Sequence, residues 1–461
     1  MEHDQVGSAV AADPLREPVE TTLDQQPPPP DGPRTRFTRR RDLLAVLVIV
    51  LVLVAATGTW WWFSDARATT SVTGPATATA PPRATAVPAT MKQLWQAASG
   101  ATTDPVVVGP TVVTAEGHQV IGHDPVTGAT RWSYTRDNLD LCTVAAAWGK
   151  AVVVYHKEHN CSEVTELDGV TGARGAQRNG DAELGTQLLY DGTYLTTTGK
   201  KLIDTWRSDL VQTQQYGTVT AVVNHDKQPR TGCTYSSQAA TAGSVAVIEQ
   251  CAGESFQRLT VIKPEGTQND GEKPNVAFSV EVPGGNARIV AVTDQRVAVA
   301  VANPNRLVVW DNAGSQVGAA PLPVPDADLA GAPKSAVEPS TAITCTQQLD
   351  PGGKCEAGSF AVSYAGGAKI ITWYSGSKLV ALDPSGMSPT WTLDGALGSG
   401  TVYADKLLVP VAEGLAVLDP LTGARSGTIT VDRKGYTGPV RLSTLGDVLL
   451  EQRGGTVVAL R

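Results

Sequence analysis

Short apolar stretches separated by turn residues dominate the chain from residue 92 to its end. The clearest stretches read VIGHDPVTG (120–128), VTELDGVTG (164–172), KLVALDPSG (378–386) and GLAVLDPLTG (414–423). In each, a strand-like run leads into Asp, and Gly follows three or four residues later. Asp and Pro initiate tight turns, and Gly supplies the positive φ that completes many of them. The pattern therefore predicts a repeated unit of strand and turn.

Each unit contains four strands, which we name A to D. A hairpin partner precedes the Asp turn, as in AKIITWYSGSKLVALD (368–383), and another strand follows it, as in TRWSY (130–134). Strands B and C flank the short turn, and D follows the Asp turn. Eight B–C pairs lie near residues 111–124, 151–168, 192–204, 244–263, 296–311, 368–383, 405–419 and 446–461. Four-stranded units of about 46 residues are typical of propeller blades. We therefore predict an all-β propeller, with eight blades preferred and seven still open.

The last unit ends on TVVALR (456–461) and has no strand D. The start of the domain offers one in QLWQA (93–97), where Trp95 is placed like Trp132. We expect this N-terminal strand to complete the last blade and close the ring, which leaves no open edge between first and last blade.

One segment before the repeats is long and apolar. Leu43–Phe63 holds 21 residues without a charge, and a membrane-spanning helix needs about 20. Five arginines lie between residues 34 and 41, and excess positive charge stays cytoplasmic, so we expect a single-pass anchor in the cell membrane with the bulk of the chain outside. The alternative is a cleaved signal peptide, but no clear cleavage site follows the apolar run.

These features predict four regions. Residues 1–42 form a disordered cytoplasmic tail, 43–63 a transmembrane helix, 64–91 an Ala/Thr/Pro-rich spacer and 92–461 the extracytoplasmic propeller. The predicted propeller carries 29 basic and 36 acidic side chains. An acidic domain without basic patches does not bind nucleic acid well, so nucleic acid is not an expected partner.

Six cysteines outside the membrane predict disulfide bonds. Two pairs have nearly equal spacing, and each brackets an A–B hairpin with its turn near 148–149 or 242–243. Hairpin register brings the ends of strands A and B together and leaves one pair inside a long loop. The predicted bonds are Cys142–Cys161, Cys233–Cys251 and Cys345–Cys355, against the alternative of free buried thiols.

The repeats resemble the pyrroloquinoline-quinone (PQQ) type β-propeller of the quinoprotein alcohol dehydrogenase-like superfamily, whose docking repeat reads Ala-x-Asp-x-x-Thr-Gly-Lys-x-x-Trp. The resemblance extends over residues 92–461, and the anchored arrangement is similar to single-pass propeller proteins of high-G+C Gram-positive envelopes. The matching positions are Asp124, Thr127, Gly128 and Trp132; Asp168, Thr171 and Gly172; Asp383, Gly386 and Trp391; and Asp419, Thr422 and Gly423.

The resemblance does not by itself imply catalysis. Enzymes of the family bind PQQ and calcium and often carry a disulfide between adjacent cysteines, and this chain has no Cys-Cys pair. No family calcium ligand or catalytic Asp can be assigned to a position here, and other members work without a cofactor. Fold alone does not define function. We therefore expect a binding or scaffold module of the cell envelope with no cofactor, whose partner is an envelope protein or polymer. A PQQ-dependent dehydrogenase with PQQ and calcium is the alternative.

Two clusters offer candidate chemistry. His156, Glu158 and His159 have side chains that can bind zinc, but no fourth ligand is evident. Asp326 and Asp328 could contact calcium, although the rest of a calcium loop is missing. The simpler interpretation for both is a polar loop, so neither is assigned as a metal site. No nucleophile elbow, phosphate loop or H-E-x-x-H motif occurs.

Long connections point to a binding face. In a propeller, D–A connections and B–C turns open on one face, here the D–A/B–C face, and A–B and C–D turns open on the other. We assign 217–232 and 324–357 as long D–A connections and 157–162 and 251–255 as enlarged B–C turns, with only 264–275 as a long C–D turn. All six cysteines then fall on the D–A/B–C face, and loops held on a scaffold often carry binding. A partner is therefore expected around 156–161, 228–251 and 326–355.

Overall fold

The computed structural model describes residues 40–219, 227–241, 243–267, 273–331, 340–343 and 370–461. The chain divides into two units, Met1–Trp62 and Phe63–Arg461. In the first, helix α1 (Arg40–Trp62) is long and apolar enough to cross a membrane, a property that signal sequences share. Its 23 residues would extend about 35 Å at the rise of an α-helix, which matches a bilayer core of about 30 Å.

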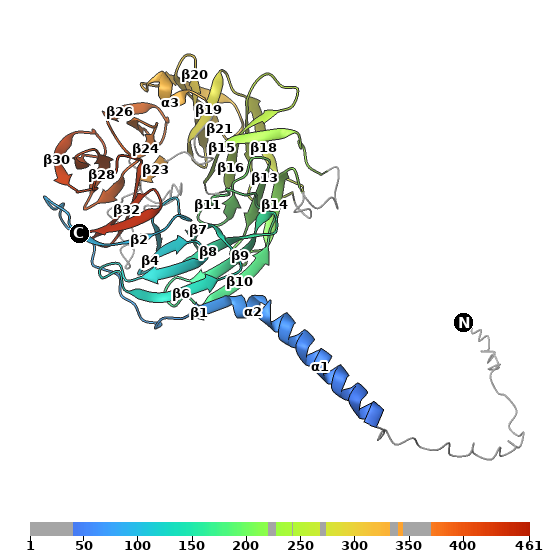
Figure 1. The fold of residues 1–461 in the computed structure, drawn as a ribbon. Coiled ribbons are helices and arrows are strands. Elements are labelled where there is room, and N and C mark those ends of the chain that lie inside the picture. The colour runs from blue at the N-terminus through green and yellow to red at the C-terminus, as the bar shows by residue number, and fades with distance from the viewer. Residues whose placement is uncertain (1–39, 220–226, 242, 268–272, 332–339, 344–369) are drawn as a thin grey trace, which may run out of the picture. The chain divides into compact units, whose positions relative to one another are not determined.

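The second unit is an eight-bladed β-propeller, as predicted. Its eight sheets are antiparallel, and Figure 1 shows them around a ring with the A strands near the centre and the D strands outside. Blades 1 to 4 contain, from A to D, β3 (Val106–Val108), β4 (Thr111–Glu116), β5 (Gln119–His123) and β6 (Thr130–Arg136); β7 (Leu141–Ala147), β8 (Lys150–Lys157), β9 (Asn160–Asp168) and β10 (Arg174–Asn179); β11 (Leu188–Tyr190), β12 (Leu195–Thr197), β13 (Leu202–Trp206) and β14 (Gln212–Gly217); and β15 (Cys233–Thr241), β16 (Ser244–Cys251), β17 (Arg258–Ile262) and β18 (Val276–Glu281).

The remaining blades follow the same order, with the short helix α3 (Asp326–Leu329) between blades 5 and 6. Blades 5 to 8 contain β19 (Gly285–Val292), β20 (Arg296–Ala302), β21 (Arg306–Asp311) and β22 (Gln316–Pro321); β23 (Ser340–Ile343), β24 (Ile370–Tyr374), β25 (Lys378–Leu382) and β26 (Pro389–Asp394); β27 (Thr401–Tyr403), β28 (Lys406–Val411), β29 (Gly414–Leu418) and β30 (Arg425–Thr430); and β31 (Val440–Leu445), β32 (Val448–Arg453), β33 (Thr456–Leu460) and β2 (Gln93–Ala98). All eight predicted B–C pairs are confirmed.

Strand β2 closes the ring. It pairs antiparallel with β33, with Ala97 opposite Val457, and so serves as strand D of blade 8. The backbone amides of Lys92 and Arg461 also donate to each other's carbonyl oxygens, at 2.8 and 3.0 Å. The predicted closure of the two chain ends in one blade is confirmed.

The Asp turns share one hydrogen-bond pattern. Oδ1 of Asp124 accepts from the amide and hydroxyl of Thr127, at 2.9 and 3.0 Å, and Asp168 and Asp419 repeat this with their own threonines. In the turn after β25, the positive φ falls on Met387 (55°) rather than on Gly386. Gly386 therefore occupies the position of the threonine, and its assignment as the closing glycine is wrong.

Tryptophans of D strands dock on the turn of the following blade. Trp132 of blade 1 donates its Nε1–H to the carbonyl of Gly169 at 3.2 Å, and its ring lies against Gly172 of blade 2. Trp391 makes the same contacts with Pro420 and Gly423. These tryptophans therefore pack between neighbouring blades.

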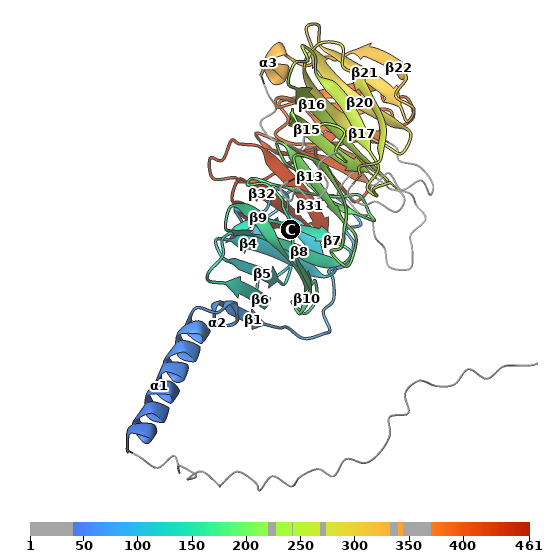
Figure 2. The same ribbon diagram turned by 90° about the vertical axis from the view of Figure 1, so that its right-hand side faces the viewer.

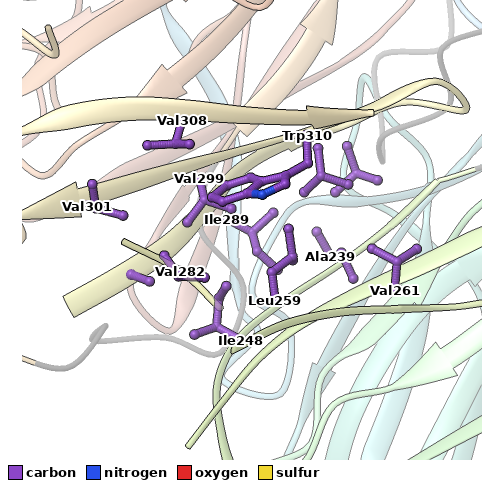
Figure 3. Packing of buried hydrophobic residues seen from close by; sticks show 14 of the residues in the cluster. Ala239, Ile248, Leu259, Val261, Val282, Ile289, Val299, Val301, Val308 and Trp310 are labelled. Atoms are coloured by element: carbon purple, nitrogen blue, oxygen red, sulfur yellow. The ribbon is translucent and has the colours of Figure 1, made fainter. Parts of the chain in front are cut away.

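Apolar side chains fill the space between neighbouring sheets. One such cluster lies between blades 4 and 5, where Ile248 and Leu259 meet Ile289, Val299 and Trp310 (Figure 3). Strand β20 (RVAVAVA), which contributes to this cluster, is an almost continuous apolar run because both of its faces are covered.

The segment after α1 is part of the second unit. Helix α2 (Asp65–Ala68) leads into β1 (Thr69–Val72), which pairs with β6 as a fifth strand of blade 1 (Figure 2). Further along, Ala84 and Met91 are buried in the core cluster that includes Leu415. The expectation that residues 64–91 form a free spacer is therefore not met, because this segment packs on the propeller.

Two of the predicted disulfides are present. Cys142 is bonded to Cys161, and Cys233 to Cys251. Cys233 and Cys251 pair directly across the A–B hairpin, as expected. Cys161, however, lies at the start of strand C and not at the end of strand B, so the first bond crosses from strand A to strand C.

The third predicted pair, Cys345–Cys355, lies outside the described residues. The assignment of 324–357 to a D–A connection is wrong beyond residue 339, because strand A of blade 6 begins at Ser340. The face on which this third pair lies stays a prediction.

Candidate functional site

The lengths of the connections between strands can be compared with those predicted for the D–A/B–C face. Segment 218–232 joins β14 to β15 and is a D–A connection, and the B–C turn from 252 to 257 is enlarged, as predicted. The B–C turn of blade 2 contains only Glu158 and His159, so its predicted enlargement is wrong. Segment 263–275 joins β17 to β18, which confirms the long C–D turn.

Helix α3 brings a D–A connection into contact with a B–C turn. It lies in the D–A connection between blades 5 and 6, and Oδ2 of Asp328 accepts from the hydroxyls of Ser375 and Ser377, at 2.5 and 2.8 Å. Both serines belong to the B–C turn of blade 6. Asp326 accepts from Nδ2 of Asn305 at 2.8 Å. The structure thus gives both acids partners within the protein.

Strand β6 presents three large side chains to blade 2. Trp132, Tyr134 and Arg136 alternate along the strand and therefore share one face. Their exposed fractions are 0%, 0% and 2%. Trp132 docks on blade 2 as described, and the ring of Tyr134 lies 6.4 Å from the ring of Tyr155 in β8. Arg136, at the D–A end of the strand, is the unusual member of this series because arginine is rarely so buried unless paired.

The partner of Arg136 is Glu163 of β9. Nη1 donates to Oε1 of Glu163, whose side chain is also only 2% exposed, and the guanidinium lies 5.8 Å from the centre of the Tyr155 ring. Glu163 accepts further from Lys157 Nζ at 3.1 Å and Gln177 Nε2 at 2.8 Å. Burial opposes the charge of Arg136, but the hydrogen bond and charge of Glu163, with a smaller contribution from the neighbouring Tyr134, outweigh it and raise the pKa of Arg136. The guanidinium is therefore a permanent buried cation.

The other edge of this guanidinium has no hydrogen-bond partner. Nε and Nη2 of Arg136, together with the hydroxyl of Tyr134, are buried without a partner in the described part of the chain. Oδ1 of Asp65 approaches Nη2 only to 3.6 Å, beyond hydrogen-bond distance. A buried donor without a partner costs about 1–3 kcal/mol, a cost that a new hydrogen bond to these groups would offset.

A cleft of about 550 Å³, partly open to solvent, is lined by Tyr134 and Arg136 among other residues. It forms because β1 extends blade 1 by one strand. In the register of β1 and β6, Thr69 lies opposite Arg136 and Ser71 opposite Tyr134, so all four side chains share a face. The residues that line the cleft are Asp65, Ala66, Thr69, Ser71, Tyr134, Arg136, Arg174 and Gln177.

This cleft lies at the outer rim between blades 1 and 2 and reaches the D–A/B–C face at Arg136. His156 ends β8, and Glu158 and His159 form the adjoining turn, but none of the three lines the cleft. Their proposed binding role remains a prediction. Their neighbour Lys157 acts on the site indirectly, because its Nζ donates to Glu163, the partner of Arg136.

Sequence reasoning missed Tyr134, Arg136 and Glu163. The sequence TRWSYTR (130–136) held a clue to Arg136, because Trp132, Tyr134 and Arg136 alternate along the strand and so lie on one face. Its partner could not be found in this way, because Glu163 lies 27 residues away on another blade.

Metal ligands gather at one place in the described residues, where donor atoms of Cys233, Glu249 and Cys251 lie within 4.8 Å of one another. The two sulfurs form a disulfide, and Glu249 pairs with Arg230 at 3.0 Å. This set does not fit a metal ion while the bond is intact, because a metal needs free thiolates.

No family model and no curated protein matches the sequence. Among solved structures, BamB from Moraxella catarrhalis is similar with a TM-score of 0.46 and 13% identity over 80% of this chain and 99% of that one. The C-terminal WD40 domain of Sif2 has a TM-score of 0.47 and 10% identity, covering 80% and 98%. The dihydro-heme d1 dehydrogenase NirN in complex with DHE has a TM-score of 0.45 and 12% identity, over 79% of this chain and 78% of that one. At these identities the likeness concerns the propeller fold alone.

Proposed function

We propose that this chain is a membrane-anchored binding or scaffold module of the cell envelope, with residues 1–42 in the cytoplasm, 43–63 in the membrane and the propeller outside. The observation that carries the proposal is the cleft between blades 1 and 2. Arg136 and Tyr134 line it, and three of their atoms, Nε and Nη2 of Arg136 and the hydroxyl oxygen of Tyr134, are buried without a hydrogen-bond partner in the described chain. Sites of this kind, with a few polar groups in a preformed hollow, are typical of binding.

The scaffold holds this site firmly. Trp132 anchors β6 to blade 2, and the bond from Cys142 to Cys161 ties strand A of blade 2 to strand C. Side chains placed on strands are positioned more accurately than side chains on loops. The PQQ-type resemblance assigns no cofactor ligand to this chain, and the proposal accordingly includes no catalytic step.

Photocrosslinking in native membranes tests the proposal. A photoreactive amino acid is placed at Arg174 on the wall of the cleft, at His159 in the neighbouring turn, or at Leu421 in a C–D turn of blade 7, whose side chain is 55% exposed. We expect adducts with an envelope component from Arg174 or His159 and none from Leu421. Adducts from Leu421 alone, or from no position, would overturn the proposal.

A further inference from the structure

The free edge of Arg136 has the geometry of a carboxylate receptor. Nε and Nη2 lie on the same side of the planar guanidinium and point their hydrogens in parallel, which matches the two oxygens of a carboxylate. Nη1, on the other side, is already used by Glu163. Tyr134 is close enough to Arg136 to help raise its pKa, and the hydrogen of its hydroxyl can be donated to a ligand as a third hydrogen bond.

The charges around the cleft favour an anion. Among the residues that line it, Arg136 and Arg174 are positive and Asp65 is negative. When a ligand displaces Asp65, the two positive charges of the lining are left to face the ligand.

The chain itself supplies a carboxylate at this position. Asp65 of α2 lies 3.6 Å from Nη2 of Arg136, and its Oδ1 is held there by Nδ2 of Asn138 at 2.8 Å. The Asp65 side chain is 59% exposed and belongs to a helix of only four residues, so it can leave without uncovering a core.

We infer that the cleft between blades 1 and 2 binds a carboxylate ligand on the Nε–Nη2 edge of Arg136, in competition with Asp65. This inference rests on the proposed binding function and names its ligand chemistry. The cleft is larger than one carboxylate, and Thr69, Ser71 and Gln177 line the rest of it. The ligand therefore has a polar body beyond its carboxylate, which either a small organic acid or a peptide with a free C-terminus provides.

The test uses the intact chain in detergent micelles and isothermal titration calorimetry. The probes are N-acetyl-triglycine with a free carboxylate, the same peptide as its amide, acetate, and methyl phosphate. We expect the free-carboxylate peptide to bind at least tenfold more tightly than its amide, because a charge-assisted bidentate hydrogen bond is worth about 1.5–3 kcal/mol. Acetate binding as tightly as the peptide would identify a small acid as the source, and weaker acetate binding would identify a peptide. Both results support the inference.

Substitutions separate competition from general charge effects. Asp65→Asn removes the internal competitor and is expected to tighten peptide binding roughly threefold to tenfold. Asp137→Asn removes an exposed acid next to Arg136 that does not line the cleft, and is expected to change binding less than twofold. Arg174→Gln should weaken binding, while Arg178→Gln, on the same strand outside the cleft, should not.

Arg136 itself is not substituted, because its loss would leave the charge of Glu163 buried without its partner and would destabilise the domain. Equal binding of peptide and amide, no binding to a folded Asp65→Asn chain, or tighter binding of methyl phosphate than of the peptide would each overturn the inference. A chain that crosslinks a partner through His159 yet fails these titrations would retain the proposed function and lose only the carboxylate assignment.

Discussion

Trp95 packs directly on Gly128, so that strand β2, which completes blade 8, is docked on blade 1. A Cβ atom at Gly128 would lie 2.6 Å from Cγ of Trp95, and the indole Nε1 donates to the carbonyl of Pro125 at 2.9 Å. Gly172 and Gly423 have the same relationship to Trp132 and Trp391. Glycine is needed at each of these positions for two reasons: its φ is positive, and the tryptophan ring leaves no room for a Cβ atom.

We therefore expect Gly172→Ala to destabilise the propeller by about 2–4 kcal/mol, since it combines left-handed strain with overpacking against Trp132. Thermal unfolding followed by circular dichroism measures the loss. Gly427→Ala is the control, because no atom lies within 4 Å of a Cβ there and its φ is not in the left-handed region. Equal melting temperatures for the two variants would contradict the docking role.

Asp204 should make stability depend on pH. This carboxyl group is fully buried in β13, and burial raises its pKa to about 6, with a contribution from nearby Asp181. Between pH 4 and 6 the folded state holds a proton that the unfolded state has lost, so stability is highest at low pH and falls as pH rises through 6. The loss amounts to about 3 kcal/mol at most, at 1.36 kcal/mol per pKa unit.

Asp204→Asn removes this titration. Melting temperatures at pH 4.5 and 7.5 are compared for the wild type and the variant, since all other titrating groups are shared. We expect the fall from pH 4.5 to 7.5 to be smaller in the variant. An identical pH profile for both proteins would show that Asp204 does not carry the effect.

Non-reducing peptide mapping should recover Cys142–Cys161 and Cys233–Cys251 as linked peptides. Cys345–Cys355 remains a prediction from the sequence. Replacing Cys142 and Cys161 together by serine should cost about 2–4 kcal/mol, because the bond restricts the unfolded chain. Linked peptides that join Cys142 or Cys161 to any other cysteine would contradict the structure.

The arginines before α1 predict the orientation of the chain. A phosphatase reporter that works only outside the cytoplasm should be active when fused after Arg461 and silent when fused before Arg34. The opposite pattern would place the cysteines in a reducing compartment and remove the basis for the disulfides and for an envelope partner.

The sequence by itself indicated a propeller, with eight blades preferred over seven, and the strand that closes the ring. These features depend on patterns within about 46 residues, such as alternating strands, Asp turns and Trp132 at a fixed distance from Asp124. Repetition makes such local patterns easier to recognise, because each blade packs against its neighbours in the same way and therefore needs similar residues at the same positions. The Cys233–Cys251 bond follows from the same cause, since hairpin register alone brings its ends together.

Only the tertiary structure decided the position of residues 65–91 and the cleft. Thr69–Val72 has no apolar alternation, and it pairs with β6 through backbone hydrogen bonds that leave no pattern in the side chains. Arg136 and Glu163 come from different blades, and Asp65 comes from a segment outside the repeats. Contacts of this kind depend on how neighbouring sheets twist and pack, a three-dimensional property that local periodicity does not encode.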